Sequence, residues 1–561
     1  MSIFVRMKHL WQRIIHAEEK NYLRWNTFTF IGIFLMVVCG LKVTWDLSAY
    51  MDVLFWDESL YLSRGLSMFQ HIPRDWGPSY SLWYKFLSLF ISDRVDLYYF
   101  NFKLTTILIS ISFFLLLMAC GVQRVLAFVF SIFFLSSFIN LPLWPRVSHF
   151  CVIVLIAGIL IAKYQATIVS KFVSFSAALL VCAFARPELF LPFMVCFLLT
   201  YFFFFATLKN SNRKDMALVA GLTVSFLFLY KFFKTPLNNG DATRGIRVFL
   251  QHFAMNYAQW HHSDAIFWLD FPDILKENFK DTTSLKGMIA SNPDMIKRHL
   301  FSNISNYSSQ TGKIIFSFFA PIFTKSTHWL CLMVSVMLFG VYFSFTKTIK
   351  DKRRKVFTLI KHNLFTLLVL FLFALPPFMV CIYAYPREHY LLLQVPLLLL
   401  LIALAISSIS VEIYKSAQKI VVISVVWFFV MPVAEDFNYF RMFRQEESLC
   451  NLKTVQYIKA HFSGKDTIHV FDMEGDITNM LPANFVNNNY MYLRDRNKIS
   501  LSDFLKENKY EIIYKTPTLS MLNSVQKDTV LFDLLKNPEK YGFFEQKTGN
   551  FTPSLLLKKP S

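Results

Sequence analysis

Long apolar runs recur through most of this chain, and they constrain its fold more than any other feature. The eleven longest runs lie at 27–45, 98–119, 123–141, 148–164, 171–185, 188–207, 215–233, 327–346, 363–384, 390–410 and 417–433. A helix needs roughly 20 predominantly apolar residues to cross a bilayer. Charged residues make up only 17% of the sequence, against about a quarter in an average soluble protein. The pattern predicts a polytopic α-helical membrane protein with about 11 transmembrane helices.

The basic residues follow a membrane topology. A net charge of +20 would suggest nucleic-acid binding in a soluble protein. With the N-terminus placed in the cytoplasm, however, twenty Lys and Arg residues fall in the inside segments and only three in the short outside loops. Cytoplasmic loops of membrane proteins show this bias. It predicts a multi-pass protein of the cell inner (cytoplasmic) membrane, with lipids and not nucleic acid as its surroundings.

The same topology divides the chain into regions. Residues 1–26 are expected to form a basic interfacial helix on the cytoplasmic surface. Residues 27–433 are expected to form the transmembrane domain, which includes outside loops at 46–97 and 234–326. Residues 434–561, called the tail below, are expected to form an extracytoplasmic domain.

The two loops and the tail carry local patterns of their own. In loop 46–97, apolar residues recur at helical spacing, which predicts two amphipathic helices along the membrane surface, joined at 71–78. Loop 234–326 is polar and is expected to hold several short interfacial helices. Alternating helix and strand signals in the tail predict a small α/β domain. The expected tail elements are helices at 454–462 and 501–508 and strands at 467–471 and 511–514.

Two adjacent carboxylates follow the first apolar run, at Asp57 and Glu58. Charge beside a bilayer is costly, so ionisable residues there are candidates for function. Arg residues in the short outside loops, where the topology disfavours basic residues, are candidates for the same reason.

Four short motifs connect these candidates. They are Asp57–Tyr61 (Asp-Glu-Ser-Leu-Tyr), Trp76–Tyr80 (Trp-Gly-Pro-Ser-Tyr), Ala185–Glu188 (Ala-Arg-Pro-Glu) and Tyr385–Tyr390 (Tyr-Pro-Arg-Glu-His-Tyr). Their order and sidedness resemble the GT-C superfold of membrane glycosyltransferases that use polyprenyl-phosphate sugars. The branch with protein O-mannosyltransferases and the aminoarabinose transferases of lipid A is the most similar. In the last motif this chain inserts Glu388-His389 between the Arg and Tyr of the family pattern.

The resemblance implies an inverting glycosyltransferase that moves a sugar from a polyprenyl-phosphate donor to a hydroxyl acceptor at the outer face. The acceptor would be a protein, a lipid or a glycan. Such a transfer needs a base for the acceptor proton, and partial desolvation raises the pKa of a carboxylate toward that role. It also needs cations for the departing phosphate, which the planar fork of Arg binds well. The branch generally needs no metal, so no cofactor is expected, although some GT-C enzymes hold a divalent metal at the Asp site.

The acidic motif contributes four candidate residues. The family motif makes Asp57 the base; the alternative is that it caps the helix that starts at Ser59. Glu58 points about 100° away on a helix, so it is expected to orient a cation or the sugar. Tyr61 lies on the same face as Asp57 and either lines the site or is an ordinary interfacial Tyr. Arg64, two turns on, would meet phosphate or lipid headgroups.

The outside-facing motifs supply the candidates for the donor phosphate. Arg387 is the first choice, and His389 is either its helper or a structural residue. Arg186 and Glu188 are expected to face the cavity, the alternative being a local ion pair. Arg146 is a further candidate.

Other features are expected to be structural. His261, His262 and Asp264 lack the spacing of a helical zinc pair, so a solvated surface is the better interpretation. The eight Cys residues show no metal spacing and no pairing in a polar loop. Two other functions remain open: a transporter or flippase of a lipid-linked sugar, which would place charges near the midplane, and a non-catalytic membrane assembly protein.

Overall fold

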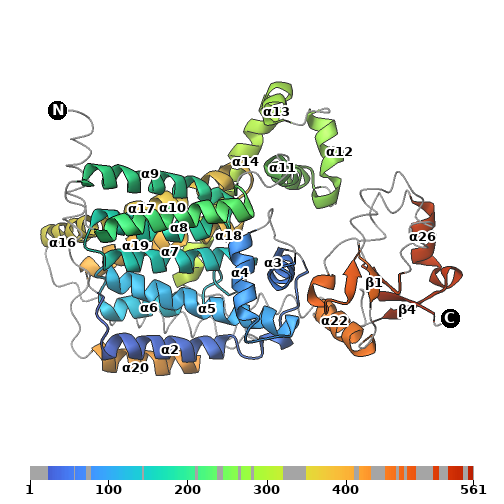
Figure 1. Ribbon diagram of the computed structural model, residues 1–561, viewed down its shortest axis with the longest axis horizontal. Coiled ribbons are helices and arrows are strands. Elements are labelled where there is room, and N and C mark those ends of the chain that lie inside the picture. The colour runs from blue at the N-terminus through green and yellow to red at the C-terminus, as the bar shows by residue number, and fades with distance from the viewer. Residues whose placement is uncertain are drawn as a thin grey trace. The chain divides into compact units, whose positions relative to one another are not determined.

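The computed structural model describes most of the chain. The described residues are 23–55, 57–70, 77–141, 144–208, 213–236, 244–262, 267–279, 284–319, 349–409, 416–430, 449–462, 467–472, 477–487, 510–516, 528–547 and 554–559. Helices account for most of them, and a small sheet is formed near the C-terminal end of the chain (Figure 1). The expected mostly helical architecture with a small C-terminal sheet is thereby confirmed.

The chain divides into two compact units. The bundle unit comprises Met1–Trp45, Ile72–Tyr80 and Phe102–Val433. The loop–tail unit comprises Asp46–His71, Ser81–Asn101 and Ala434–Ser561. The first outside loop is therefore grouped largely with the tail, and not with the apolar helices that precede and follow it in the sequence.

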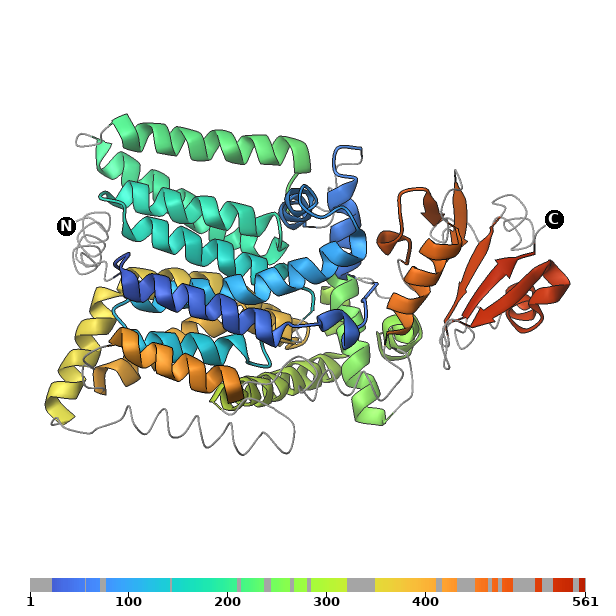
Figure 2. The ribbon, with the colours of Figure 1, turned by 90° about the horizontal axis from the view of Figure 1, so that it is seen from below.

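Apolar helices dominate the bundle unit. Ten of the eleven apolar runs coincide with helices, namely α2 (Thr27–Val43), α5 (Arg94–Ala119), α6 (Arg124–Leu135), α7 (Val147–Lys163), α8 (Ile168–Ala183), α9 (Phe190–Ala206), α10 (Arg213–Phe233), α17 (Leu364–Tyr383), α19 (Val395–Ile409) and α20 (Ser416–Val430). Figures 1 and 2 show these helices with their long axes nearly parallel. The eleventh run, 327–346, lies outside the described residues, as does 1–22 of the predicted N-terminal helix. Helix α16 (Ile349–His362) leads into α17.

Five helical stretches among the described residues are long and apolar enough to cross a membrane. They are Thr27–Ala49, Arg94–Ala119, Pro187–Ala206, Arg213–Phe233 and Leu364–Tyr383. The other apolar helices are shorter, at 10–17 residues. Membrane-type helices are therefore present as expected, whereas the number of eleven spans stays a prediction.

Local side-chain chemistry explains where several of these helices begin. The Asn26 side chain accepts a hydrogen bond from the Thr29 backbone N–H at 3.1 Å and so caps α2. A reciprocal capping box between Thr167 and Ser170 starts α8. Each cap satisfies a backbone donor that the helix itself leaves without an acceptor.

Small residues allow the closest helix packing in the bundle unit. Gly158 of α7 faces Ala178 of α8, and a Cβ added at Gly158 would lie 2.4 Å from the Ala178 Cβ. Small residues at helix interfaces are typical of membrane bundles, where close backbone approach replaces the hydrophobic effect as the driving force. By contrast, α9 and α10 expose large apolar side chains such as Leu198 and Val224, which suits a surface that faces lipid.

The second outside loop forms its own helical layer within the bundle unit. Its helices are α11 (Arg244–His261), α12 (Phe267–Phe279), α13 (Leu285–Ser291) and α14 (Pro293–Phe319). Several helices are present as predicted, but α11 and α14 are long, at 18 and 27 residues, and not short; their interfacial position stays a prediction. Phe249, Phe253 and Phe279 are the centre of their shared core. The Asn303 side chain on α14 donates to the backbone oxygens of Ile382 and Ala384 at the end of α17.

The loop–tail unit combines helices with a mixed sheet. From the first outside loop come η1 (Leu47–Ala49), α3 (Asp57–Leu66) and most of α4 (Pro78–Leu87). From the tail come α22 (Cys450–His461), β1 (Ile468–Phe471), η5 (Ile477–Met480), β2 (Phe485–Asn487), β3 (Ile512–Lys515), α26 (Thr529–Lys536), η7 (Pro538–Tyr541), β4 (Phe543–Lys547) and β5 (Ser554–Lys558). The strand order is β2-β1-β3-β5-β4, in which β1 pairs in parallel with β2 and β3, and β5 pairs antiparallel with β3 and β4.

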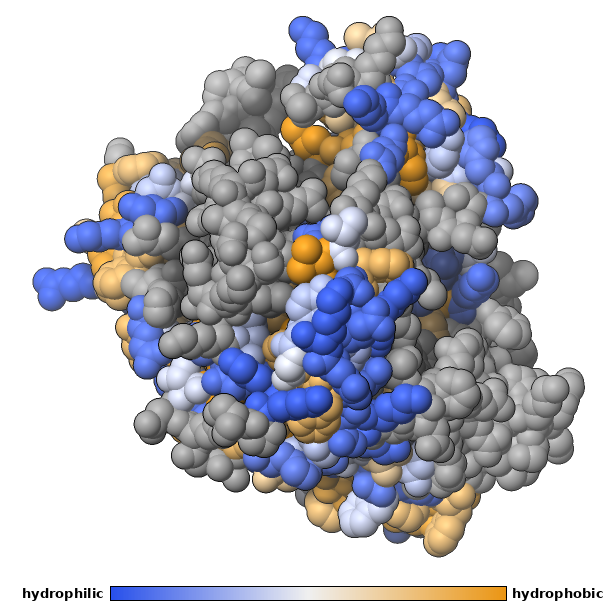
Figure 3. Space-filling view, turned by 90° about the vertical axis from the view of Figure 1, so that its right-hand side faces the viewer, coloured by the Kyte–Doolittle hydropathy of each residue, from blue (hydrophilic) through white to orange (hydrophobic). Residues whose placement is uncertain are grey.

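The tail has its own hydrophobic core. Leu531 and Leu535 of α26 pack with Phe471, Ile513 and Leu556 of the sheet. Hydrophilic residues predominate among the described residues at the centre of the view in Figure 3. The predicted helix 454–462 and strands 467–471 and 511–514 coincide with α22, β1 and β3, and the predicted helix 501–508 lies outside the described residues.

The contact between α7 and α8 gives a test of the packing. We expect Gly158→Val to lower the stability of the protein by about 1–3 kcal/mol, because the new side chain overlaps Ala178 and must separate the helices. Gly221→Val on α10 is the matched control, since a Cβ there has no neighbour within 4 Å. Thermal unfolding of both variants in detergent, followed by tryptophan fluorescence, measures the effect. Equal melting temperatures for the two variants would contradict the close packing.

Candidate functional site

The acidic motif forms the first turn of a helix. Helix α3 begins at Asp57, and its first turn carries both Asp57 and Glu58. Carboxylates are favourable at this end because the helix dipole is positive there. The two side chains differ in environment: Asp57 is half-buried, whereas Glu58 is only 2% exposed.

A hydrogen-bond network surrounds the buried Glu58 carboxylate. The Tyr84 hydroxyl of α4 donates to Oε1 of Glu58, and the Asn101 amide of α5 donates to the same oxygen at 3.1 Å. Asn101 also donates to the Tyr84 oxygen at 2.9 Å and accepts from the Trp83 indole N–H at 2.8 Å. A buried charge needs such partners to offset its desolvation. Glu58 therefore joins three helices and holds the turn in which Asp57 lies.

The remaining residues of α3 differ in burial, and one of them packs closely against α4. Tyr61 is buried, with 6% of its surface exposed. Arg64 is half-buried. Gly65 lies so close to α4 that an added Cβ would be 2.5 Å from the Ser81 carbonyl oxygen.

The candidates for the donor phosphate gather in the bundle unit. Arg186 precedes η2 (Pro187–Leu189), forms an ion pair with Glu188 at 2.8 Å and lies over the Tyr390 ring at 4.6 Å. The ion pair that was the alternative for Arg186 and Glu188 is therefore present. Arg387 directly precedes the short helix α18 (Glu388–Leu391) and is half-buried.

His389 lies close to both guanidinium groups. It is buried, and burial together with Arg186 and Arg387 holds the pKa of His389 well below its usual range. The imidazole is therefore neutral at physiological pH. Burial also raises the pKa of Glu388, and Arg387 opposes part of that rise.

His252 joins this group and was not predicted from the sequence. Its ring stacks on Tyr385 with centroids 6.0 Å apart, and its Nδ1 lies 2.6 Å from the Val248 carbonyl oxygen. Burial, and then the Arg387 guanidinium, lower the pKa of His252 to about 4. No motif marks this residue: it lies on an amphipathic helix, far in sequence from Arg387. We call Arg186, Arg387, His252 and His389 the basic cluster.

Arg146 occupies a different environment. It is fully buried, and its guanidinium donates to the Thr105 and Thr106 hydroxyls and to the Asn140 carbonyl oxygen. It also lies over the Phe102 ring at 4.3 Å. These contacts favour a structural role for Arg146 over phosphate binding.

The structure thus sorts the predicted residues into two groups. Asp57, Glu58, Tyr61 and Arg64 lie together on α3 in the loop–tail unit. The basic cluster and Glu188 lie together in the bundle unit.

Metal-ligating side chains form no cluster in the part of the chain that the structure describes. No group of three or more His, Cys, Asp or Glu side chains there is arranged to hold a metal ion. His261 and His262 are exposed, and Asp264 lies outside the described residues. The seven described Cys residues are free thiols.

The Glu58 network predicts unequal effects of two substitutions. Glu58→Ala should lower stability by about 1–3 kcal/mol, because it leaves the buried Tyr84 and Asn101 donors without their acceptor. Glu58→Gln keeps an acceptor oxygen in place and should cost clearly less. Thermal unfolding of the purified variants measures both. A Glu58→Ala protein as stable as the Gln variant would show that the network does not hold α3.

Comparison with known proteins gives no family assignment. The chain matches no protein-family model, and a search of curated proteins finds no similar sequence. The interpretation of function therefore rests on the two residue groups described above.

Proposed function

We propose that this chain is a GT-C-type membrane glycosyltransferase. It would move a sugar from a polyprenyl-phosphate donor to a hydroxyl on a protein, lipid or glycan, with inversion at the anomeric carbon. The observation that carries the proposal is the basic cluster, because its composition suits a phosphate ester. The motif resemblance and the acidic turn of α3 add to it.

The electrostatics of the basic cluster favour an anionic ligand. Two guanidinium groups lie near two imidazoles that burial keeps neutral. Glu188 pairs with Arg186, and Glu388 is a carboxylate whose pKa is raised by burial. Positive charge in a partly buried place is costly, and a phosphate offsets that cost through charge-assisted hydrogen bonds. Arg387 would meet the donor phosphate, while Arg186 and neutral His389 and His252 would complete the site.

The acidic turn of α3 supplies the base in this proposal. The half-buried Asp57 would take the proton of the acceptor hydroxyl as its oxygen attacks the anomeric carbon. The bond between that carbon and the phosphate oxygen breaks, and its electron pair leaves with the polyprenyl phosphate. Glu58 would not act as a base, because its carboxylate is buried and engaged by Tyr84 and Asn101. Its role is to hold the turn.

The membrane setting follows from the helices and the charge distribution. We place the chain in the cell inner membrane with about 11 spans, a cytoplasmic N-terminus and an extracytoplasmic tail. The five membrane-length helices and the excess of basic residues on one side support this topology. The apolar side chains exposed on helices such as α9 and α10 would contact lipid, and the prenyl chain would lie among the spans.

The base assignment is tested by Asp57→Asn. We expect the substitution to lower sugar transfer by about 100-fold or more, since an amide cannot accept the acceptor proton. The measurement is transfer of labelled sugar from polyprenyl-phosphate donors by the purified protein. Asp46→Asn is the matched control, because Asp46 is an exposed Asp in the same loop. Undiminished transfer by Asp57→Asn would remove Asp57 from the mechanism, and no transfer by the wild type from any donor would favour the transporter or assembly functions.

The phosphate assignment is tested by Arg387→Ala. We expect the KM for the donor to rise at least about tenfold, because a charge-assisted hydrogen bond to the phosphate is lost. Arg387→Lys should recover part of the affinity through its charge. Arg298→Ala is the control, since Arg298 is exposed over Trp260 and lies outside the basic cluster. A donor KM equal to that of the control would exclude Arg387 from the phosphate site.

A further inference from the structure

Helix α22, the first helix among the described residues of the tail, receives its N-terminal cap from the first outside loop. Helix α22 begins at Cys450, and Leu449 at its N-cap position makes no side-chain cap. Instead, the Asp52 carboxylate accepts hydrogen bonds from the backbone N–H groups of Asn451 at 2.9 Å and Leu452 at 2.8 Å. These are the two donors that a capping side chain normally binds. The cap therefore depends on a residue from the other end of the chain.

The Asn451 side chain extends this contact to the sheet. Its Nδ2 donates to the Val53 carbonyl oxygen at 2.8 Å, and its Oδ1 accepts from the Tyr514 hydroxyl of β3 at 2.9 Å. The Tyr514 ring also packs edge-on against Phe55, with centroids 6.0 Å apart. The segment that leads into α3 is therefore in contact with both α22 and β3.

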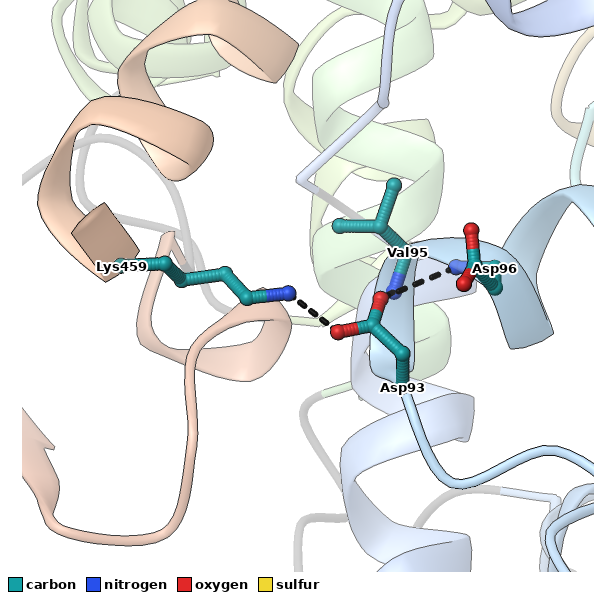
Figure 4. Close-up of polar contacts among 4 residues, drawn as sticks. All are labelled: Asp93, Val95, Asp96 and Lys459. Atoms are coloured by element: carbon teal, nitrogen blue, oxygen red, sulfur yellow. Dashed lines mark hydrogen bonds and ion pairs between the residues drawn. The ribbon is translucent and has the colours of Figure 1, made fainter. Parts of the chain in front are cut away.

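A second set of contacts involves the C-terminal part of α22. Asp93 accepts hydrogen bonds from the backbone N–H groups of Val95 and Asp96, which caps α5, and it pairs with Lys459 of α22 (Figure 4). Lys459 and the backbone donors outweigh the effect of burial and lower the pKa of Asp93. The adjacent Arg94 donates to the backbone oxygens of Thr478 and Asn479 at 3.2 and 3.0 Å.

Asn479 then reaches α3 itself. Its Nδ2 lies 3.4 Å from the hydroxyl oxygen of Ser59, the residue that follows Glu58. Ser59 is fully buried. Tail contacts are thus made before Asp57, at Asp52 and Phe55, and after it, at Ser59.

We infer that the tail is a positioning element for Asp57, with Asp52 and Asn479 as the residues that transmit its hold on α3. The inference rests on the proposed function for its catalytic consequence only. The tail would then serve the chemistry by fixing the base, in addition to any contact it makes with the acceptor. Neither Asp52 nor Asn479 needs to touch the substrate for this role.

Asp52→Ala in the full-length protein tests the inference. We expect backbone amide exchange in α3 to become about fivefold faster, because the Asp52 cap on α22, a typical helix cap in strength, is the contact that links the tail to the segment before α3. The kcat for transfer should fall with little change in the donor KM, and Asp52→Asn, which keeps one acceptor oxygen, should give intermediate values. Asp528→Ala is the matched control, because Asp528 caps α26 within the tail through the Leu531 N–H at 3.0 Å. The control should leave exchange in α3 unchanged.

The outcomes separate the two proposals. Unchanged exchange in α3 for Asp52→Ala, or an equal increase in the Asp528→Ala control, would overturn the positioning role. Faster exchange in Asp52→Ala alone, combined with no sugar transfer by the wild type, would support the positioning role and reject the glycosyltransferase. If Asp52→Ala does not fold, Asn479→Ala gives the same measurement with the α22 cap intact, and unchanged exchange in α3 would then overturn the inference.

Discussion

The buried carboxylate of Glu58 is the constraint on which the candidate catalytic region depends. A charged group removed from water costs several kcal/mol unless hydrogen bonds replace its solvent. Tyr84 and Asn101 provide those bonds, and each belongs to a different helix from Glu58. The first turn of α3 is therefore held in this position by α4 and the start of α5. Asp57 is covalently next to Glu58, so the same network determines the place of the proposed base.

The candidate residues of the proposed reaction fall into two groups, one in each compact unit. The acidic residues make their described contacts within the loop–tail unit, and the basic cluster makes its own within the bundle unit. The environment of the basic cluster lowers the pKa of both of its histidines. Burial and the neighbouring guanidinium groups keep His252 and His389 neutral, so that they can hydrogen-bond a phosphate without adding charge. Asp57 is half-buried.

Periodicity and local patterns predicted a large part of the fold. The apolar runs located ten helices within the described residues, and the alternating signals in the tail located α22, β1 and β3. Strands β4 and β5 were missed because apolar and polar residues do not alternate regularly in either. Strand β5 is a run of Leu between Ser554 and Lys558 and is buried in the sheet along most of its length. The cost of charge near a membrane was enough to single out Asp57, Glu58 and Arg387.

Sequence patterns could not predict which residues contact Glu58 and Arg387, because those contacts are made through tertiary packing. Tyr84 and Asn101 lie 26 and 43 residues from Glu58; Tyr84 resembles an ordinary polar residue of a loop helix, and Asn101 falls within the apolar run 98–119. His252 has no motif and meets Arg387 only through tertiary packing. The grouping of the first outside loop with the tail was missed for the same reason. Chain continuity favours the neighbouring spans, whereas the contacts are made with residues almost four hundred positions later.

This separation in sequence has a consequence for biosynthesis. The Asp52 carboxylate and the Leu452 N–H that it binds are 400 residues apart. At synthesis rates of roughly 5–20 residues per second, about 20–80 s pass between the appearance of the first and the second. Throughout that interval the first outside loop has been made but lacks the tail that completes its packing. During most of translation, the first outside loop therefore lacks its contacts with the tail. A chaperone or the translocation machinery can bind the loop during this interval.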